Sequence, residues 1–110
     1  MIISSIKSFA EHETAVNRLN IALKNQGIFS KKLSQDLENY ASKLQKVTTF
    51  SDESIIETQT LLTTFGLAGK QLKETTLSAL DLSKGLGIDL RTATLLLGKA
   101  AVGETGTLAR

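Results

Sequence analysis

Hydrophobic residues recur at helical spacing along most of the chain. The most regular stripe alternates steps of four and three residues, and it comprises Leu33, Leu37, Tyr40, Leu44 and Val47. This spacing places the apolar side chains on one face of an α-helix, while lysine, glutamine and aspartate residues cover the other faces. The pattern predicts a helix that is capped by Ser30 and that buries Leu37, Tyr40 and Leu44 in a core.

Start and stop signals divide the pattern into five helices. Serine and aspartate cap helix starts because their side-chain oxygens accept hydrogen bonds from unpaired backbone N–H groups. Glycine ends many helices because it readily adopts the left-handed backbone conformation. These signals predict helices over about residues 4–26, 30–48, 51–66, 70–84 and 90–103, with glycine stops at Gly27, Gly66, Gly85 with Gly87, and Gly103.

The apolar faces of the other helices are less regular. The first helix repeats hydrophobic residues every seven positions, at Ile2, Phe9, Val16 and Leu23. The fourth helix is predicted to face inward with Leu72, Thr76, Ala79, Ser83 and Leu86. The fifth helix is predicted to do so with Leu90, Ala93, Leu97 and Ala100 or Ala101. These faces predict that helices adjacent in sequence pack against each other.

The fold class follows from the helices and their connections. No stretch alternates apolar and polar residues for long, and the chain contains no proline. The predicted loops are short, which favours packing between sequence neighbours. The sequence therefore predicts an all-α fold, a small five-helix bundle with short loops, as a single domain over residues 1–110.

The fifth predicted helix is apolar on more than one side. Leu95, Leu96 and Leu97 are consecutive, and Val102 follows in the same helix. A helix that is apolar all round must be covered by other helices or by a partner. These four residues therefore form a candidate interaction surface, which predicts self-association or an exposed apolar patch. Gly98 interrupts the same helix, and we interpret it as a site of close packing rather than as a hinge.

Composition narrows the classes of function. The formal net charge is +2 with both signs interspersed, which disfavours nucleic acid as a partner. The absence of cysteine excludes disulfides and thiolate metal sites. No apolar run approaches the roughly 20 residues that cross a bilayer, and the N-terminal residues do not resemble a signal peptide.

The titratable side chains do not predict an enzyme. His12 is the only histidine, and a metal site would need further ligands, so we interpret it as a histidine without chemistry at the edge of the first helix stripe. Asp52, Glu53 and Asp89 are explained by helix starts. The sequence shows no nucleophile motif and no phosphate-binding glycine loop. We therefore predict no catalytic residue, no cofactor and no metal ligand.

One glycine turn suggests an alternative function. Gly85-Leu86-Gly87 lies between two predicted helices, as in helix-hairpin-helix modules that bind DNA phosphates with backbone N–H groups. Ala93 comes two residues too late for that motif, and Asp89 would repel a phosphate at the helix start. A glycine stop followed by an aspartate cap explains the turn better, so a small helical DNA-binding module remains the alternative.

A set of ordered stretches resembles a known family. The stretches are Phe9-Ala-Glu-His-Glu-Thr-Ala-Val-Asn-Arg-Leu19, Gln26-Gly27, Leu44-Gln-Lys-Val-Thr-Thr-Phe-Ser-Asp-Glu53, Leu61-Leu-Thr-Thr-Phe-Gly66, Leu80-Asp-Leu-Ser83, Gly87-Ile-Asp-Leu90 and Leu97-Gly-Lys-Ala-Ala-Val-Gly-Glu-Thr-Gly-Thr-Leu-Ala-Arg110. Together and in this order they resemble the N-terminal helical region of tail tape measure proteins of phages and prophages. No single stretch is specific, but the ordered set covers nearly the whole chain.

The resemblance implies a structural virion protein without catalytic residues. Tape measure proteins extend through the lumen of a growing phage tail and set its length. They meet tail-assembly chaperones, tail tube subunits and tip proteins, in the host cytoplasm during assembly and then in the virion. Such proteins are much longer than 110 residues and continue beyond the stretch that matches Leu108-Ala-Arg110. We therefore expect this chain to be an excised domain or a prophage remnant that serves assembly rather than measuring.

Overall fold

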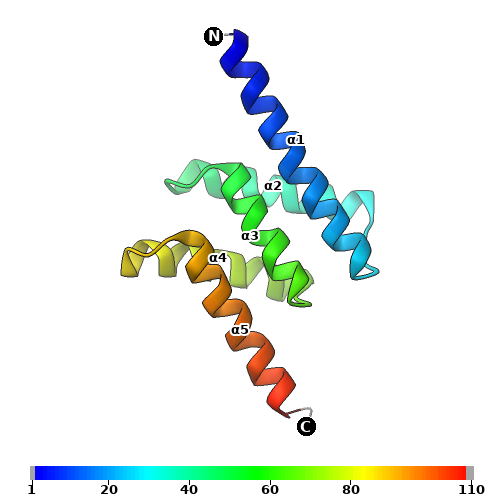
Figure 1. Cartoon of the computed structure of the whole chain (residues 1–110), viewed down its shortest axis with the longest axis vertical. Helices are drawn as coiled ribbons and strands as arrows, with labels where there is room; N and C mark the ends of the chain where they lie inside the picture. The colour runs from blue at the N-terminus through cyan, green and yellow to red at the C-terminus, as the bar shows by residue number, and fades with distance from the viewer. Residues whose placement is uncertain (1, 109–110) are drawn as a thin grey trace. The chain divides into compact units, whose positions relative to one another are not determined.

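The computed structural model describes the backbone of residues 2–108 and the side chains of residues 9–103. It contains five α-helices, α1 (Ile2–Asn25), α2 (Lys31–Val47), α3 (Asp52–Thr64), α4 (Gly69–Leu86) and α5 (Leu90–Leu108) (Figure 1). No strand occurs within residues 2–108, and the connections between helices are short. The predicted all-α fold with five helices is confirmed.

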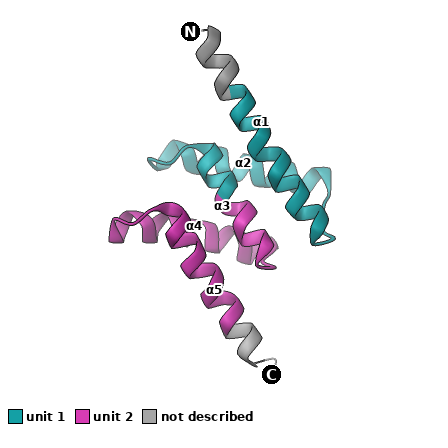
Figure 2. Cartoon of the chain, viewed as in Figure 1, with its two compact units in different colours: residues 1–57 teal, residues 58–110 magenta. Residues whose placement is uncertain are grey.

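The chain divides into two compact units, residues 1–57 and residues 58–110 (Figure 2). The first unit contains α1, α2 and the first half of α3, and the second contains the rest of α3 with α4 and α5. The division therefore falls inside a continuous helix rather than in a loop.

The first unit has a core of leucine, isoleucine and alanine side chains. Its fully or nearly buried residues are Ala15, Leu19, Ala22, Leu23, Leu37, Ala41, Leu44, Ile55 and Ile56. The α1 and α2 helices pack against each other, and the Ser34 hydroxyl donates a 2.6 Å hydrogen bond to Asn20 Oδ1 between them. Burial of Leu37 and Leu44 confirms the predicted stripe of α2.

The edges of that stripe differ from the prediction. Tyr40 is only half-buried, and Val47 at the end of α2 is 77% exposed. Phe9 on α1 is also largely exposed, although it belongs to the seven-residue repeat. A periodic stripe predicts which side of a helix faces the core, but it does not predict how completely the neighbouring helices cover each residue of that side.

The second unit mixes apolar and hydroxyl side chains in its core, where α4 packs against α5. Leu62, Leu72, Leu80 and Ala93 are buried together with threonines. The hydroxyls of Thr63, Thr76 and Thr94 each donate a 2.8 Å hydrogen bond to the backbone carbonyl one turn earlier. Because these hydroxyls are satisfied within their own helices, their burial does not leave an unpaired polar group.

Three details of the predicted second-unit helices are wrong. The α4 helix continues through Gly85 to Leu86, and it ends because Gly87 adopts a left-handed conformation with φ of 67°. The α5 helix continues through Gly103 to Leu108. Leu86 is exposed rather than inward-facing, whereas of the two alternatives Ala100 and Ala101 the second is half-buried. Glycine stops a helix only where the chain adopts positive φ, and Gly85 and Gly103 keep helical geometry.

Gly98 on α5 marks a close contact inside the second unit, as predicted. It is buried, and a Cβ atom added to it would lie 2.5 Å from Cδ2 of Phe65. The ring of Phe65 therefore lies directly against the α5 backbone. This contact supports the packing interpretation of Gly98 over a hinge.

Within the described residues, none of the helices combines the length and the apolar character needed to cross a membrane.

Candidate functional site

The first unit gathers one imidazole and three carboxylates from all three of its helices. His12 comes from α1, Glu38 from α2, and Asp52 and Glu53 from the first turn of α3. We call these four residues the His12 cluster. Their side chains are between 20 and 34% exposed, so the cluster is partly buried but open to solvent.

Both ring nitrogens of His12 face carboxylates. Nδ1 lies 3.3 Å from Oδ2 of Asp52 and 3.4 Å from Oε2 of Glu53. Nε2 lies 3.7 Å from Oε1 of Glu38. His12, Asp52 and Glu53 each offer one ligand atom, and these atoms all lie within 4.8 Å of one another.

Hydrogen bonds around the start of α3 fix the two adjacent carboxylates. The Asp52 backbone N–H donates a 2.6 Å hydrogen bond to Oε1 of Gln45 on α2. The Ser54 N–H donates to the Ser51 hydroxyl at 3.2 Å, which is the cap that the sequence predicts. Thr48 also donates its hydroxyl proton to the Leu44 carbonyl at 2.7 Å, closing the end of α2. These contacts hold the turn between α2 and α3 and so direct both acids toward His12.

Crowding of the acids changes the proton affinity of Glu53. The pKa of Glu53 is raised above its ordinary value of 4.5, first because the Asp52 side chain hydrogen-bonds to it. Partial burial and repulsion from the Asp52 charge act in the same direction, whereas His12 opposes them. The two neighbouring carboxyl groups therefore favour a state in which Glu53 holds a proton or a cation lies nearby.

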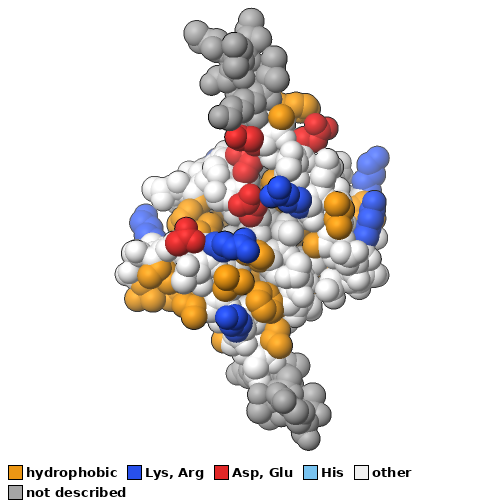
Figure 3. All heavy atoms as spheres, in the orientation of Figure 1, with side chains coloured by type: hydrophobic (Ala, Val, Ile, Leu, Met, Phe, Trp, Pro, Cys, Tyr) orange, Lys and Arg blue, Asp and Glu red, His pale blue; other side chains and the backbone are white. Residues whose placement is uncertain are grey.

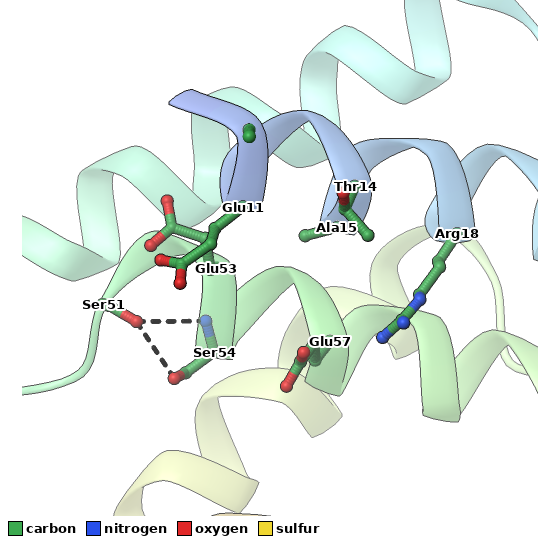
Figure 4. Close-up of a pocket in the computed structure, with 9 residues that line it drawn as sticks. Glu11, Thr14, Ala15, Arg18, Ser51, Glu53, Ser54 and Glu57 are labelled. Carbon is green, nitrogen blue, oxygen red and sulfur yellow. Dashed lines mark hydrogen bonds between the residues drawn. The ribbon is translucent and has the colours of Figure 1, made fainter. Parts of the chain in front are cut away.

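An open pocket of about 600 Å³ lies beside the cluster in the same unit (Figure 4). Its lining comprises Ala10, Glu11, Thr14, Ala15 and Arg18 with Ser51, Glu53, Ser54 and Glu57. In Figure 4 the Arg18 side chain extends from α1 toward Glu57 on α3. Glu53 belongs to both the pocket and the cluster, so a molecule in the pocket has access to one edge of the cluster.

The predicted interaction surface on α5 is only partly exposed. Leu96 is 51% and Val102 is 42% exposed, whereas Leu95 and Leu97 are half-buried. Figure 3 shows hydrophobic side chains among basic ones on the face that carries α5. Two of the four residues thus present apolar surface to solvent, and the other two lie partly within the second unit. Their role in binding stays a prediction.

The glycine turn between α4 and α5 is a helix stop followed by a helix cap. The Gly87 N–H donates to the Ser83 carbonyl, and the Asp89 carboxylate accepts a 3.3 Å hydrogen bond from the Thr92 N–H. A carboxylate thus occupies the start of α5, where a DNA phosphate would have to bind. The geometry gives the alternative DNA-binding function no support.

Comparison of the chain with models of protein families, with curated proteins and with solved structures found no match.

The His12 cluster was missed from the sequence. Asp52 and Glu53 have a sufficient explanation as acids at a helix start, and His12 alone cannot form a site. One signal was available, because His12 follows Phe9 by three residues and precedes Val16 by four. That position beside the stripe predicts that the imidazole faces neighbouring helices. Which residues it would meet there depends on packing between helices.

Proposed function

We propose that this chain is a non-catalytic structural and assembly domain of a phage tail tape measure protein. The observation that carries the proposal is the ordered set of stretches that resembles the N-terminal helical region of that family. The all-α fold with short connections agrees with a helical region of this kind.

Four of the seven stretches that carry the resemblance lie at helix ends, and the other three begin inside α1, α4 and α5. Residues 44–53 span the end of α2 and the start of α3, where Gln45 and Ser51 make their capping hydrogen bonds. Residues 61–66 end α3, and residues 87–90 contain Gly87 and the Asp89 cap. These stretches support the proposal where their residues cap or end helices, because such residues help to determine a helical arrangement.

In this proposal the domain acts by contact with other tail proteins. Its partners are the tail-assembly chaperone, tail tube subunits or tip proteins, in the host cytoplasm during assembly and then in the virion. Leu96 and Val102 supply exposed apolar surface on α5 for such contacts. Measuring belongs to the remainder of a longer chain, because a helix adds only about 1.5 Å per residue and a tail requires many residues.

The proposal is tested by disrupting the fold in a parent phage. Leu44→Asp and Leu80→Asp together place a carboxylate at one buried site in each unit, which is costly enough to unfold marginally stable helices. We expect lysates to contain fewer complete tails when they are counted by electron microscopy. Val47→Asp is the matched control, because it introduces the same charge at an exposed position of α2.

Two outcomes would contradict the proposal. Normal yields of normal-length tails from the double variant would show that the domain is dispensable for assembly. Abundant tails that are uniformly and greatly shortened would show that the domain itself measures length.

A further inference from the structure

The His12 cluster brings nitrogen and oxygen ligands together from separate helices. Nδ1 of His12 on α1 and the carboxylates of Asp52 and Glu53 at the start of α3 all lie within 4.8 Å of one another. Carboxylates alone suit Mg²⁺ and Ca²⁺, whereas an imidazole nitrogen suits Zn²⁺ and other transition metals. A site with both ligand types therefore favours transition metals over Mg²⁺ and Ca²⁺, whereas a group of surface acids alone does not.

The distances in the cluster match the edges of a tetrahedral metal site. Zn²⁺ binds histidine nitrogen and carboxylate oxygen at about 2.0–2.2 Å, so two ligands of a tetrahedral site lie about 3.3–3.6 Å apart. His12 Nδ1 is 3.3 Å from Asp52 Oδ2 and 3.4 Å from Glu53 Oε2. Both distances are longer than the most common N–H···O hydrogen-bond length of about 2.9–3.0 Å. A single N–H bond also cannot align with both carboxylates, whereas one ion can bind all three atoms.

Glu38 faces the second ring nitrogen of the imidazole at ion-pair distance, beyond the length of a hydrogen bond, and can attract that side of the ring. Its Oε1 lies 3.7 Å from Nε2 of His12, on the opposite side of the ring from Asp52 and Glu53. Metal-binding histidines commonly donate their second ring N–H to a carboxylate, which fixes the tautomer and the ring orientation. With its proton on Nε2, the ring presents the lone pair of Nδ1 to the two ligand carboxylates.

The charge and the solvent exposure of the His12 cluster also favour a divalent metal ion. Three carboxylates around one imidazole leave the cluster negatively charged whether or not His12 is protonated. Two ligand carboxylates balance the charge of a divalent ion, and the partial exposure of the side chains leaves space for water as a fourth ligand.

We propose that His12, Asp52 and Glu53 bind one divalent transition-metal ion of the Zn²⁺ type, with Glu38 positioning the imidazole. The ion joins the middle of α1 to the start of α3. It therefore stabilises the first unit, because a ligand that binds only the folded state raises the free energy of unfolding. The proposal is independent of the proposed function in phage tails.

The single histidine of the chain allows a direct test in the wild-type protein. The untagged full chain, freed of metal with EDTA and dialysed, is titrated with ZnCl₂ while the imidazole nitrogens are followed by NMR. We expect the Nδ1 resonance to move to a metal-bound position and to saturate at one equivalent, with Nε2 still protonated. Lack of a saturable change, or ligation through Nε2, would overturn the proposal. Equal binding of Mg²⁺ would also overturn it, because the imidazole would then have no role.

Variants test the ligands one at a time by calorimetry. His12→Gln and Asp52→Asn should each weaken Zn²⁺ binding by at least about tenfold, and Glu38→Gln by about tenfold. Glu57→Gln is the matched control, because Glu57 is an exposed carboxylate one turn further along α3. Unchanged Zn²⁺ affinity in a His12→Gln variant that keeps its circular dichroism spectrum would contradict the proposal. Where a variant does not fold, the NMR titration of the wild-type protein decides.

Discussion

Two glycines inside helices have opposite surroundings at the scale of single atoms. A Cβ atom on Gly98 of α5 would lie 2.5 Å from Cδ2 and 2.6 Å from Cε2 of Phe65. A Cβ atom on Gly85 of α4 would meet no atom within 4 Å. Glycine in a helix interior costs about 1 kcal/mol relative to alanine. The surroundings therefore decide whether alanine recovers that free energy or creates a clash.

We expect Gly98→Ala to lower the free energy of unfolding by up to about 2 kcal/mol, because an overpacking cost of about 1–3 kcal/mol opposes a gain of about 1 kcal/mol in helix propensity. Gly85→Ala should instead raise it by up to about 1 kcal/mol. Urea denaturation measures both changes. In a Phe65→Leu background the penalty at Gly98 should shrink, because the ring that causes it is gone. Equal effects at the two glycines would contradict the close contact with Phe65.

The raised pKa of Glu53 predicts how stability depends on pH. A carboxyl group with a higher pKa in the folded state binds its proton more tightly there, so it contributes stability below its unfolded pKa near 4.5. That contribution is lost as the pH rises through the higher folded pKa. At neutral pH the ionised Glu53 therefore destabilises the first unit when no metal ion is present.

Glu53→Gln should accordingly increase the free energy of unfolding at pH 7 in the presence of EDTA. The difference from the wild-type protein should disappear by about pH 3, where Glu53 is protonated in both states. Thermal denaturation across this pH range measures it. Glu57→Gln, which removes a neighbouring exposed charge, should show a smaller difference. A Glu53→Gln variant that is less stable at pH 7 would disagree with the direction of the shift.

At the scale of elements, the residues that precede α2 and α4 have similar φ and ψ but different chemistry, and α4 differs further because its first residue, Gly69, has φ of 58°. Ser30 precedes α2 with φ of −147° and ψ of 154°, and its hydroxyl oxygen accepts a 3.0 Å hydrogen bond from the Leu33 N–H. Ala68 precedes α4 with φ of −152° and ψ of 166° but has no side-chain oxygen to accept such a bond. The start of α4 is therefore ready for a cap that its sequence does not supply.

Removing the capping hydroxyl before α2 and adding one before α4 should change the free energy of unfolding in opposite directions. Ser30→Ala should lower the free energy of unfolding by about 0.5–2 kcal/mol, and Ala68→Thr should raise it by about 1 kcal/mol. Ala68→Val is the control, because valine has the shape of threonine without the hydroxyl. Chemical denaturation of all three variants provides the measurement. If valine stabilises α4 as much as threonine does, side-chain capping is not the cause.

Helix starts were predictable from the sequence because their signals are local. Ser30, Ser51 and Asp89 all accept the capping hydrogen bonds that their residue types favour. Helix ends were less predictable, because Gly87 adopts positive φ whereas Gly85 and Gly103 do not. The residue type permits a stop at each of these positions, and the surrounding chain determines which one is used.

The His12 cluster could not be predicted in the same way. Its members come from three helices, and His12 is far in sequence from Asp52 and Glu53. Local patterns place each residue on a helix and on a face. They do not determine how the three helices of the first unit rotate about their axes, and this rotation brings the acids to the imidazole.

At the scale of the whole molecule, the exposed apolar residues of α5 are candidates for contacts with other chains. Leu96 and Val102 on α5 are both more than 40% exposed. Because Leu96 lies outside the core, its replacement by a charged residue should change the free energy of unfolding by no more than about 0.5 kcal/mol. A surface that is dispensable for folding remains available for contacts with other chains.

We expect the wild-type chain to self-associate through this part of α5, and Leu96→Lys to reduce that association. Sedimentation velocity over a range of protein concentrations measures the effect. Val47→Lys is the control, because it adds the same charge at an exposed apolar position of α2. A wild-type chain that stays monomeric at all concentrations would rule out self-association, and Leu96 would then be a candidate contact only for the partners in the proposed function.

The position of the unit boundary inside α3 has a consequence for how the chain unfolds. The helix has 13 residues, and the boundary divides it between residues 57 and 58. Isolated helices shorter than about 12–15 residues are marginal in water, so neither part of α3 persists once the other part has melted. Loss of one unit therefore removes structure from its neighbour. Amide hydrogen exchange along α3 should then show a single opening free energy on both sides of Glu57, with both units exchanging in one cooperative step.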